Sequence, residues 1–567
     1  MTLARLILRS LAYYRRTGAV VVIGLAIAAA VIVGSLVIGD SIEGSIRQTA
    51  LARLGEIHHG VTAPRFFRAD IADDADLRGT SATLIQADGS ARAEGDDAVI
   101  AGITVIGADK NLLSLYPDSD THAPEPRSAL INESLAAAAG VDSGDTLLVT
   151  VSRPGEAMAD TLFARRERDE TLATLRVTVQ DVLPDLGPGG FRLDPSTAMP
   201  RNVIVDREWL AQQIGEAERA NTLVFGPEDN PQRRQQIDEA MTLGDHGLYL
   251  RRHRNWLSVF SDAVVLSEAQ VQAAELAAAG QAFPTSVYLA DTITAADDPS
   301  REIAYAVVTD VSAEQLPLRS REAVPVDGLI LNAWAAEDLG AEIDERFTVN
   351  WRVSTPSGYE DRSAELTLTG IAEMKDLSAD PDLVPDFEGI TDAEHIDDWD
   401  PPFPVDLSLV TDRDDEYWER HRAAPKAFVT SDLLRRMWRG EDGDGPWITS
   451  VRLDGADADE YERTLLAKLE PEDAGFRFMP VREQALAASK GTSDFGQLFL
   501  GMSFFLVLAG AGLAGMLMRL SAERRASQAG IMMATGFGEK QAGRAQNQKE
   551  APEQYGSRNK IPQHFKK

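Results

Sequence analysis

The chain of 567 residues contains no cysteine. Disulfide frameworks, thiolate metal sites, iron–sulfur clusters and cysteine nucleophiles are therefore excluded. The sequence also has no G-x-x-x-x-G-K-[ST] motif, so it does not hydrolyse ATP in the P-loop manner. No G-x-S-x-G nucleophile motif occurs, which disfavours an extracytoplasmic hydrolase. We therefore predict a chain that is not an enzyme and has no cofactor or metal ion, with any ATP hydrolysis in a separate subunit.

Positive charge is scarce. The chain has 56 Lys and Arg against 89 Asp and Glu, which gives a formal net charge of −33 at pH 7. A nucleic acid needs a protein surface of the opposite sign, so nucleic acid is excluded as the main partner. The charge is also unevenly distributed, because residues 1–39 carry +4 and residues 519–567 carry +6, leaving −43 for the residues between them.

Two long runs lack charge altogether. Thr17 to Gly39 and Phe495 to Met518 are each long enough to cross about 30 Å of hydrocarbon as a helix. The first run exceeds the apolar region of a signal peptide, which favours an uncleaved anchor; the second has a buried core helix as its alternative. By the positive-inside rule both basic ends lie in the cytoplasm. We therefore expect a protein of the bacterial inner membrane with cytoplasmic termini and a large periplasmic or extracellular domain.

Two segments resemble each other at an offset of 200 residues. The segment ALINESLAAAAGVDSGDTLLVTVSRPG at 129–155 is similar in outline to LILNAWAAEDLGAEIDERFTVNWRVSTPSG at 329–358, with Asn132 aligned to Asn332. Each reads as a short apolar strand, a helix, an alternating strand, a turn and a further strand. This order predicts two copies of one α+β module. The alternative is a chance match between common patterns.

The predicted fold class is an α+β membrane protein in which two transmembrane helices flank a large extracytoplasmic region built from two similar α+β modules. Ile42, Ile46, Ala50 and Leu54 recur every four residues, which indicates an amphipathic stalk after the first run. The predicted parts are a cytoplasmic N-terminus 1–17, transmembrane helix 18–38, stalk helix 39–64, first module 65–255, helical linker 256–279, second module 280–480, stalk 481–494, transmembrane helix 495–518, cytoplasmic coupling segment 519–540 and an atypical polar tail 541–567.

The N-terminal run from residue 9, FGQLFLGMSFFLVLAGAGLAGMLMRL from residue 495, and above all ERRASQAGIMMATGFGEKQ at 523–541 resemble the FtsX/MacB/LolC-type ABC transporter permeases. The resemblance implies a MacB-like periplasmic domain and a separate cytosolic ABC ATPase. It further implies export or release of a lipid, lipoprotein or peptide, or mechanotransmission to an outer partner. Permeases of this family have further spans, so the resemblance also implies a chain truncated after its second transmembrane helix.

The resemblance places ATPase coupling in the segment after the second charge-free run. The residues it implies are Glu523, Arg524, Arg525, Gly530, Ile531, Met532, Met533, Gly536 and Phe537. Basic residues beside both runs are expected to anchor the chain to membrane lipid, namely Arg15, Arg16 and Arg519. The chain is also expected to need a further permease subunit or a homodimer partner. The alternatives are an ordinary stop-transfer flank and, for the whole chain, a non-transporting surface receptor or adhesion protein with two anchors.

Overall fold

The computed structural model describes residues 9, 12–13, 15–77, 79–152, 172–196, 198–226, 231–319, 328–355, 358–387, 389–399, 405–439, 447–489 and 495–535. The chain divides into two compact units. One comprises Met1–Thr49 with Leu486–Lys567, and the other comprises Ala50–Ala485. Each unit is described by itself below.

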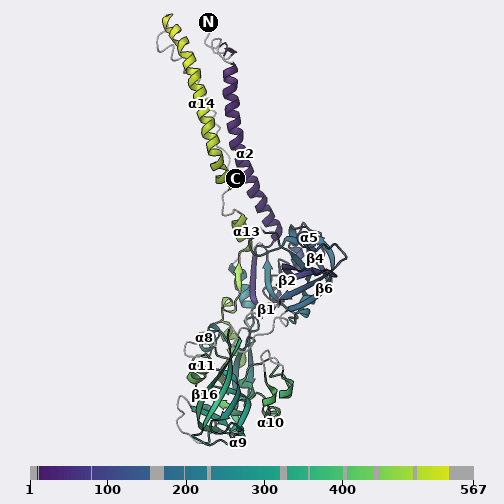
Figure 1. Ribbon diagram of the computed structural model, residues 1–567, viewed down its shortest axis with the longest axis vertical. Coiled ribbons are helices and arrows are strands. Elements are labelled where there is room, and N and C mark those ends of the chain that lie inside the picture. The colour runs from purple at the N-terminus through teal and green to yellow at the C-terminus, as the bar shows by residue number, and fades with distance from the viewer. Residues whose placement is uncertain are drawn as a thin grey trace, which may run out of the picture. The chain divides into compact units, whose positions relative to one another are not determined.

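The first unit contains most of two 40-residue helices, α2 (Arg15–Leu54, purple) and α14 (Phe495–Ala534, yellow), both drawn in Figure 1. Across the described residues, no helix combines the length and the apolar character needed to cross a membrane. The prediction of two transmembrane helices, and with it the membrane-protein fold class, is therefore wrong.

The second unit contains two six-stranded rings. In the first ring the strands follow the order β2-β3-β7-β4-β6-β5, and β2 also pairs with β5. The second is a closed barrel of order β12-β13-β17-β14-β16-β15. The strands of the first ring are β2 Ser81–Ala93, β3 Ile100–Ala108, β4 Ser128–Asn132, β5 Thr146–Ser152, β6 Leu172–Leu183 and β7 Asn202–Asp206. Those of the second are β12 Val287–Ala295, β13 Glu302–Thr309, β14 Gly328–Asn332, β15 Arg346–Thr355, β16 Gly358–Ala372 and β17 Ala427–Phe428.

The two rings share one topology. Each strand of the first ring has a counterpart at the same place in the second, from β2 and β12 through to β7 and β17. The parallel pairs also correspond, because β3 pairs with β7 as β13 does with β17, and β4 with β6 as β14 does with β16. Even the register shift recurs, between Ala129 and Leu130 in one ring and between Leu329 and Ile330 in the other. The 200-residue offset seen in the sequence therefore corresponds to a duplicated strand order.

A buried asparagine fixes the same corner of both rings. Asn132 and Asn332 are fully buried and cap the helices that follow β4 and β14. Each accepts a hydrogen bond from a backbone N–H in the first turn of its helix. The Nδ2 of Asn132 donates to the carbonyl of Pro200 at 2.7 Å, and that of Asn332 donates to the carbonyl of Pro425 at 2.9 Å. Both prolines precede the counterpart strands β7 and β17, so one amide ties three elements together.

Two smaller sheets accompany the rings. One has the order β19-β1-β8-β2, in which β2 is the first half of the ring strand; the other has the order β9-β10-β18-β11. By their place in the chain β1 corresponds to β10, β8 to β18, and β9 to β19. Each sheet therefore takes its outermost strand from the end of the other module. The bounds are β1 His59–Arg68, β8 Arg219–Phe225, β9 Leu248–His253, β10 Trp256–Ser261, β11 Ala282–Thr285, β18 Ser450–Asp454 and β19 Arg477–Met479.

Short helices cover these strands in each module, and Figure 1 labels several of them. They are α3 Ile71–Asp74, α4 Lys110–Ser114, α5 Glu133–Ala139, α6 Arg207–Gln213, α7 Pro231–Ala240, α8 Glu268–Ala277, α9 Ala333–Asp338, α10 Asp412–His421, α11 Ser431–Arg439, α12 Ala458–Leu466 and α13 Val481–Ser489. The segment 256–279, expected as a helical linker, instead contains the sheet strand β10 before α8.

Candidate functional site

The chain enters and leaves the two-module unit through one pair of strands. β1 directly follows α2 in the sequence, and β19 directly precedes α13. The two strands pair antiparallel over three positions, Gly60 with Met479, Val61 with Phe478 and Thr62 with Arg477. Because the pairing is antiparallel, the incoming and outgoing chain lie at the same end of the pair.

Side-chain contacts close that end. Arg482 donates from Nη1 to the carbonyl of Gly55 at 2.8 Å and from its backbone N–H to the carbonyl of His58 at 3.1 Å. Partial burial lowers the pKa of Arg482. A Cβ on Gly60 would lie 3.1 Å from a methyl group of Val481, so the two chain ends pack closely. We name residues 54–62 together with 477–482 the terminal clasp.

A cleft of about 1050 Å³ lies in the first module, between the end of β1, α3, the start of β2, the start of α4 and α6. Three arginines line it: Arg68, Arg207 and Arg219. Five acidic residues also line it, namely Asp70, Asp73, Asp109, Glu208 and Glu218. The lining is therefore strongly polar.

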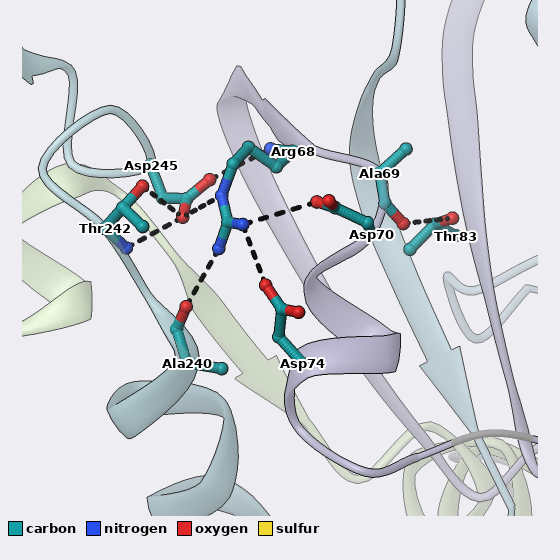
Figure 2. A network of polar contacts seen from close by, with 8 residues as sticks. All are labelled: Arg68, Ala69, Asp70, Asp74, Thr83, Ala240, Thr242 and Asp245. Carbon is teal, nitrogen blue, oxygen red and sulfur yellow. Dashed lines mark hydrogen bonds and ion pairs between the residues drawn. The ribbon is translucent and has the colours of Figure 1, made fainter.

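Arg68 is held entirely by its own chain, as Figure 2 shows. Its Nε lies 3.1 Å from the buried carboxylate of Asp245, and its Nη1 lies 2.8 Å from Asp74 and 3.4 Å from Asp70. Its Nη2 donates to the carbonyl of Ala240 at 2.9 Å. Burial opposes its charge, but the hydrogen bond with Asp74 and the charge of Asp245 outweigh burial and raise its pKa. Arg68 thus joins β1 to α3 and to the loop before β9.

Arg207 differs from Arg68 although it lines the same cleft. It is the first residue of α6, whose N-cap Asp206 accepts from the backbone N–H of Trp209 at 2.8 Å. Its side chain is 11% exposed. Its Nε and Nη1 are buried and have no hydrogen-bond partner among the residues that the structure describes. Its ion pair with Glu208 is long, at 3.9 Å, and that carboxylate is 77% exposed.

A histidine and two carboxylates meet in the second module. His253, Asp380 and Asp382 offer one nitrogen and two oxygens within 4.8 Å of one another. Burial raises the pKa of Asp380. Arg251 lies 3.6 Å from Asp382, and the buried Arg452 is attracted to Asp380, so cations already compete for these carboxylates. The sequence did not predict this cluster, because a sheet strand and a distant loop supply its members.

The predicted coupling segment begins on α14. Arg519 pairs with Glu523 one turn later at 3.2 Å. Gly530, Ile531 and Met533 are exposed, as are Arg15 and Arg16 at the start of α2. The side chains of Arg524, Arg525 and Met532, and the whole of Gly536 and Phe537, lie outside the described residues. The structure does not assemble these residues into a site, and their coupling and lipid-anchoring roles stay predictions.

No protein-family model and no curated protein sequence matches the chain. Among solved structures, the periplasmic region of MacB from Actinobacillus actinomycetemcomitans is similar at 9% identity and a TM-score of 0.21, covering 33% of this chain and 84% of that one. The extracellular domain of the noncanonic ABC-type transporter YknZ from Gram-positive bacteria is similar at 15% identity and a TM-score of 0.21, covering 32% and 90%. At these TM-scores neither likeness carries an argument about fold or function. The truncation expected from the family resemblance has no support in them.

Proposed function

We propose that the chain is a component of an ABC-type transporter or mechanotransmission assembly. A separate cytosolic ATPase drives the assembly, and the chain itself is not an enzyme. It works at the bacterial inner membrane, with its acidic two-module unit on the periplasmic or outer side. Movement of the modules exports or releases a lipid, lipoprotein or peptide.

The observation that carries this proposal is the terminal clasp. Both ends of the two-module unit meet at the pairing of β1 with β19. A displacement that reaches Leu54 or Val481 therefore acts on one short strand pair. Because β19 ends the second module and β1 begins the first, moving this pair moves both modules.

The resemblance of residues 523–541 to the coupling segment of ABC permeases supports the ATPase partner. The test is copurification of the native ATPase with the full chain. The triple variant Arg524→Glu, Arg525→Glu and Met532→Asp should abolish copurification, because a micromolar contact is worth about 8 kcal/mol and a carboxylate buried in an apolar groove costs several kcal/mol.

The matched control reverses two exposed arginines of the second ring, Arg346→Glu and Arg362→Glu. It should leave copurification unchanged, and both variants should keep the wild-type melting temperature. Equal ATPase recovery with the triple variant and the wild type would contradict the proposal and favour a receptor or adhesion protein.

A further inference from the structure

We infer that His395, Asp415 and Glu419 form a surface site for a divalent transition-metal ion of the zinc class. All three residues, named here the α10 cluster, belong to the second module, in the long connection between β16 and β17. The inference rests on the side chains of this connection and is independent of the proposed ABC-type assembly.

The first step is the geometry of the three donors. The Nδ1 of His395 lies 3.6 Å from the Oδ2 of Asp415 and 3.6 Å from the Oε1 of Glu419. The three donor atoms all lie within 4.8 Å of one another. A tetrahedral zinc ion with bonds of about 2.0–2.2 Å places its ligands roughly 3.3–3.6 Å apart. The histidine and the two carboxylates therefore need only small side-chain movements to bind one ion together.

The second step is that contacts outside the cluster hold its two elements together. His395 directly precedes the short 3-10 helix η6 (Ile396–Asp398), and both carboxylates lie one turn apart on α10. Trp418 of α10 donates from its Nε1 to the carbonyl of Ala393 at 3.2 Å. Ile396 is buried in the same apolar cluster as Trp418. Because these contacts fix η6 against α10, a metal ion finds donors that are already arranged.

The third step is the charge pattern of α10. Glu416 pairs with Arg420 four residues later, at 3.5 Å, so opposite charges meet on that face of the helix. Asp415 and Glu419 have the same spacing but carry like charges, which destabilise a helix. Within the described chain their ion pairs are with His395, which is charged only when protonated. A divalent cation between the two carboxylates supplies the missing positive charge.

The cluster of His253, Asp380 and Asp382 offers the same donor types in different surroundings. Arg251 lies 3.6 Å from Asp382, and Arg452 is attracted to Asp380. Arginine side chains thus already neutralise that cluster. Among the described residues, no arginine forms an ion pair with the two carboxylates of the α10 cluster. The α10 cluster is therefore the better site for a metal ion.

The donor set selects the class of ion. Zinc accepts imidazole nitrogen and carboxylate oxygen together, and with three protein ligands it keeps a fourth position open to water. Calcium takes about six to eight oxygen ligands, and magnesium prefers an octahedral shell of oxygens, so three mixed donors suit neither. The three side chains are between 36% and 52% exposed, which gives water access to the fourth position.

The experiment titrates the metal-free full chain with Zn²⁺, Ca²⁺ and Mg²⁺ in separate calorimetric runs. The melting temperature is recorded with and without each ion. We expect a single tight site for Zn²⁺ with micromolar affinity, and a melting temperature that Zn²⁺ raises. Ca²⁺ and Mg²⁺ should bind at least about tenfold more weakly, because both prefer oxygen ligands.

Variants separate a metal site from a structural ion pair. His395 makes no side-chain cap to η6, so His395→Gln removes a ligand without removing a helix cap. His395→Gln and Glu419→Gln should each weaken Zn²⁺ binding by more than the roughly tenfold that loss of an outer-shell partner costs. The matched control Glu416→Gln, on the same helix, should leave Zn²⁺ affinity unchanged. Without metal, Glu419→Gln should melt at or above the wild-type temperature, because it removes a like-charge pair.

Three results would overturn the inference. One is a wild-type chain that has no tight Zn²⁺ site, or that binds Ca²⁺ equally well. Another is Zn²⁺ affinity that stays at the wild-type value in either His395→Gln or Glu419→Gln, or that falls equally in Glu416→Gln. The last is a metal-free melting temperature lowered by Glu419→Gln, together with a wild-type melting temperature that Zn²⁺ does not raise, which would make the cluster a structural ion pair.

Discussion

The two modules share every ring strand and differ in what joins two of them. Between β6 and β7 the first module has the short segment 184–201, whereas between β16 and β17 the second has residues 373–426, which include helix α10. This longer segment brings Asp380 and Asp382 to His253 on the adjoining sheet. The comparison teaches that the duplicated framework tolerates divergence mainly in its connections. The polar side chains differ between the two modules in these connections, whereas the order of the ring strands is the same.

The largest expected difference between the modules concerns the residue that follows Pro200 in the first module and Pro425 in the second. Lys426 is fully buried, 2.8 Å from Asp414, and donates to the carbonyl of Ala304 at 2.9 Å, whereas its counterpart Arg201 is exposed. Burial lowers the pKa of Lys426 despite the carboxylate beside it. Lys426→Met leaves the buried Asp414 carboxylate without its cation, so we expect a loss of about 3–5 kcal/mol in the free energy of unfolding. Arg201→Met should change it by no more than about 0.5 kcal/mol. Urea unfolding of both variants measures the difference, and equal losses would break the comparison.

A smaller difference depends on pH. Burial raises the pKa of Asp310 to about 6, and its Oδ1 accepts from the backbone N–H of Ser286 at 2.7 Å. Because this folded-state pKa lies above the unfolded value, the folded protein holds the proton more tightly. The stability that protonation of Asp310 contributes is therefore greatest below about pH 4 and is lost as the pH rises to about 6. The loss is roughly 3 kcal/mol, from the difference between the folded and unfolded pKa at 1.36 kcal/mol per pKa unit.

Asp310→Asn should flatten this part of the profile of unfolding free energy against pH. Asp109→Asn, at the corresponding and partly exposed position of the first module, is the control and should keep the wild-type slope. The explanation fails if the slope between pH 4 and pH 6 is the same in wild type and Asp310→Asn.

The smallest expected effect is shared by the two modules. Gly140 and Gly340 follow the corresponding helices α5 and α9 with φ of +64° and +57°, and a Cβ at either position would meet no atom within 4 Å. Conformational strain alone should therefore make Gly140→Ala and Gly340→Ala cost about 1 kcal/mol each. Thermal unfolding that shows a cost in one module and none in the other would mean that the two corners are not equivalent.

The sequence predicted the parts of the fold that local patterns encode. The sequence aligned Asn132 with Asn332, and the structure shows that both residues cap the equivalent helices α5 and α9. Local sequence patterns could not predict that β9 and β19 each join the sheet of the other module. β19 has only three residues, and its partner β1 lies at the other end of the chain. The sequence did not single out Arg207 either, because a sequence does not show which arginine side chains lack a hydrogen-bond acceptor in the folded protein. The two predicted transmembrane helices are the part of the predicted fold that the described residues contradict.

The central claim is that displacement enters the two-module unit through the terminal clasp. The absence of native cysteine allows spin labels at Thr62→Cys and Arg477→Cys, which face each other across β1 and β19. The matched pair is Arg251→Cys and Ser258→Cys, on the corresponding strands β9 and β10. The most direct measurement is the electron paramagnetic resonance distance for each pair in the complex with its cytosolic ATPase, with and without a non-hydrolysable ATP analogue. We predict that the analogue lengthens or broadens the distance across the clasp and leaves the control pair unchanged. An unchanged clasp distance, or the same change at both pairs, would contradict the account.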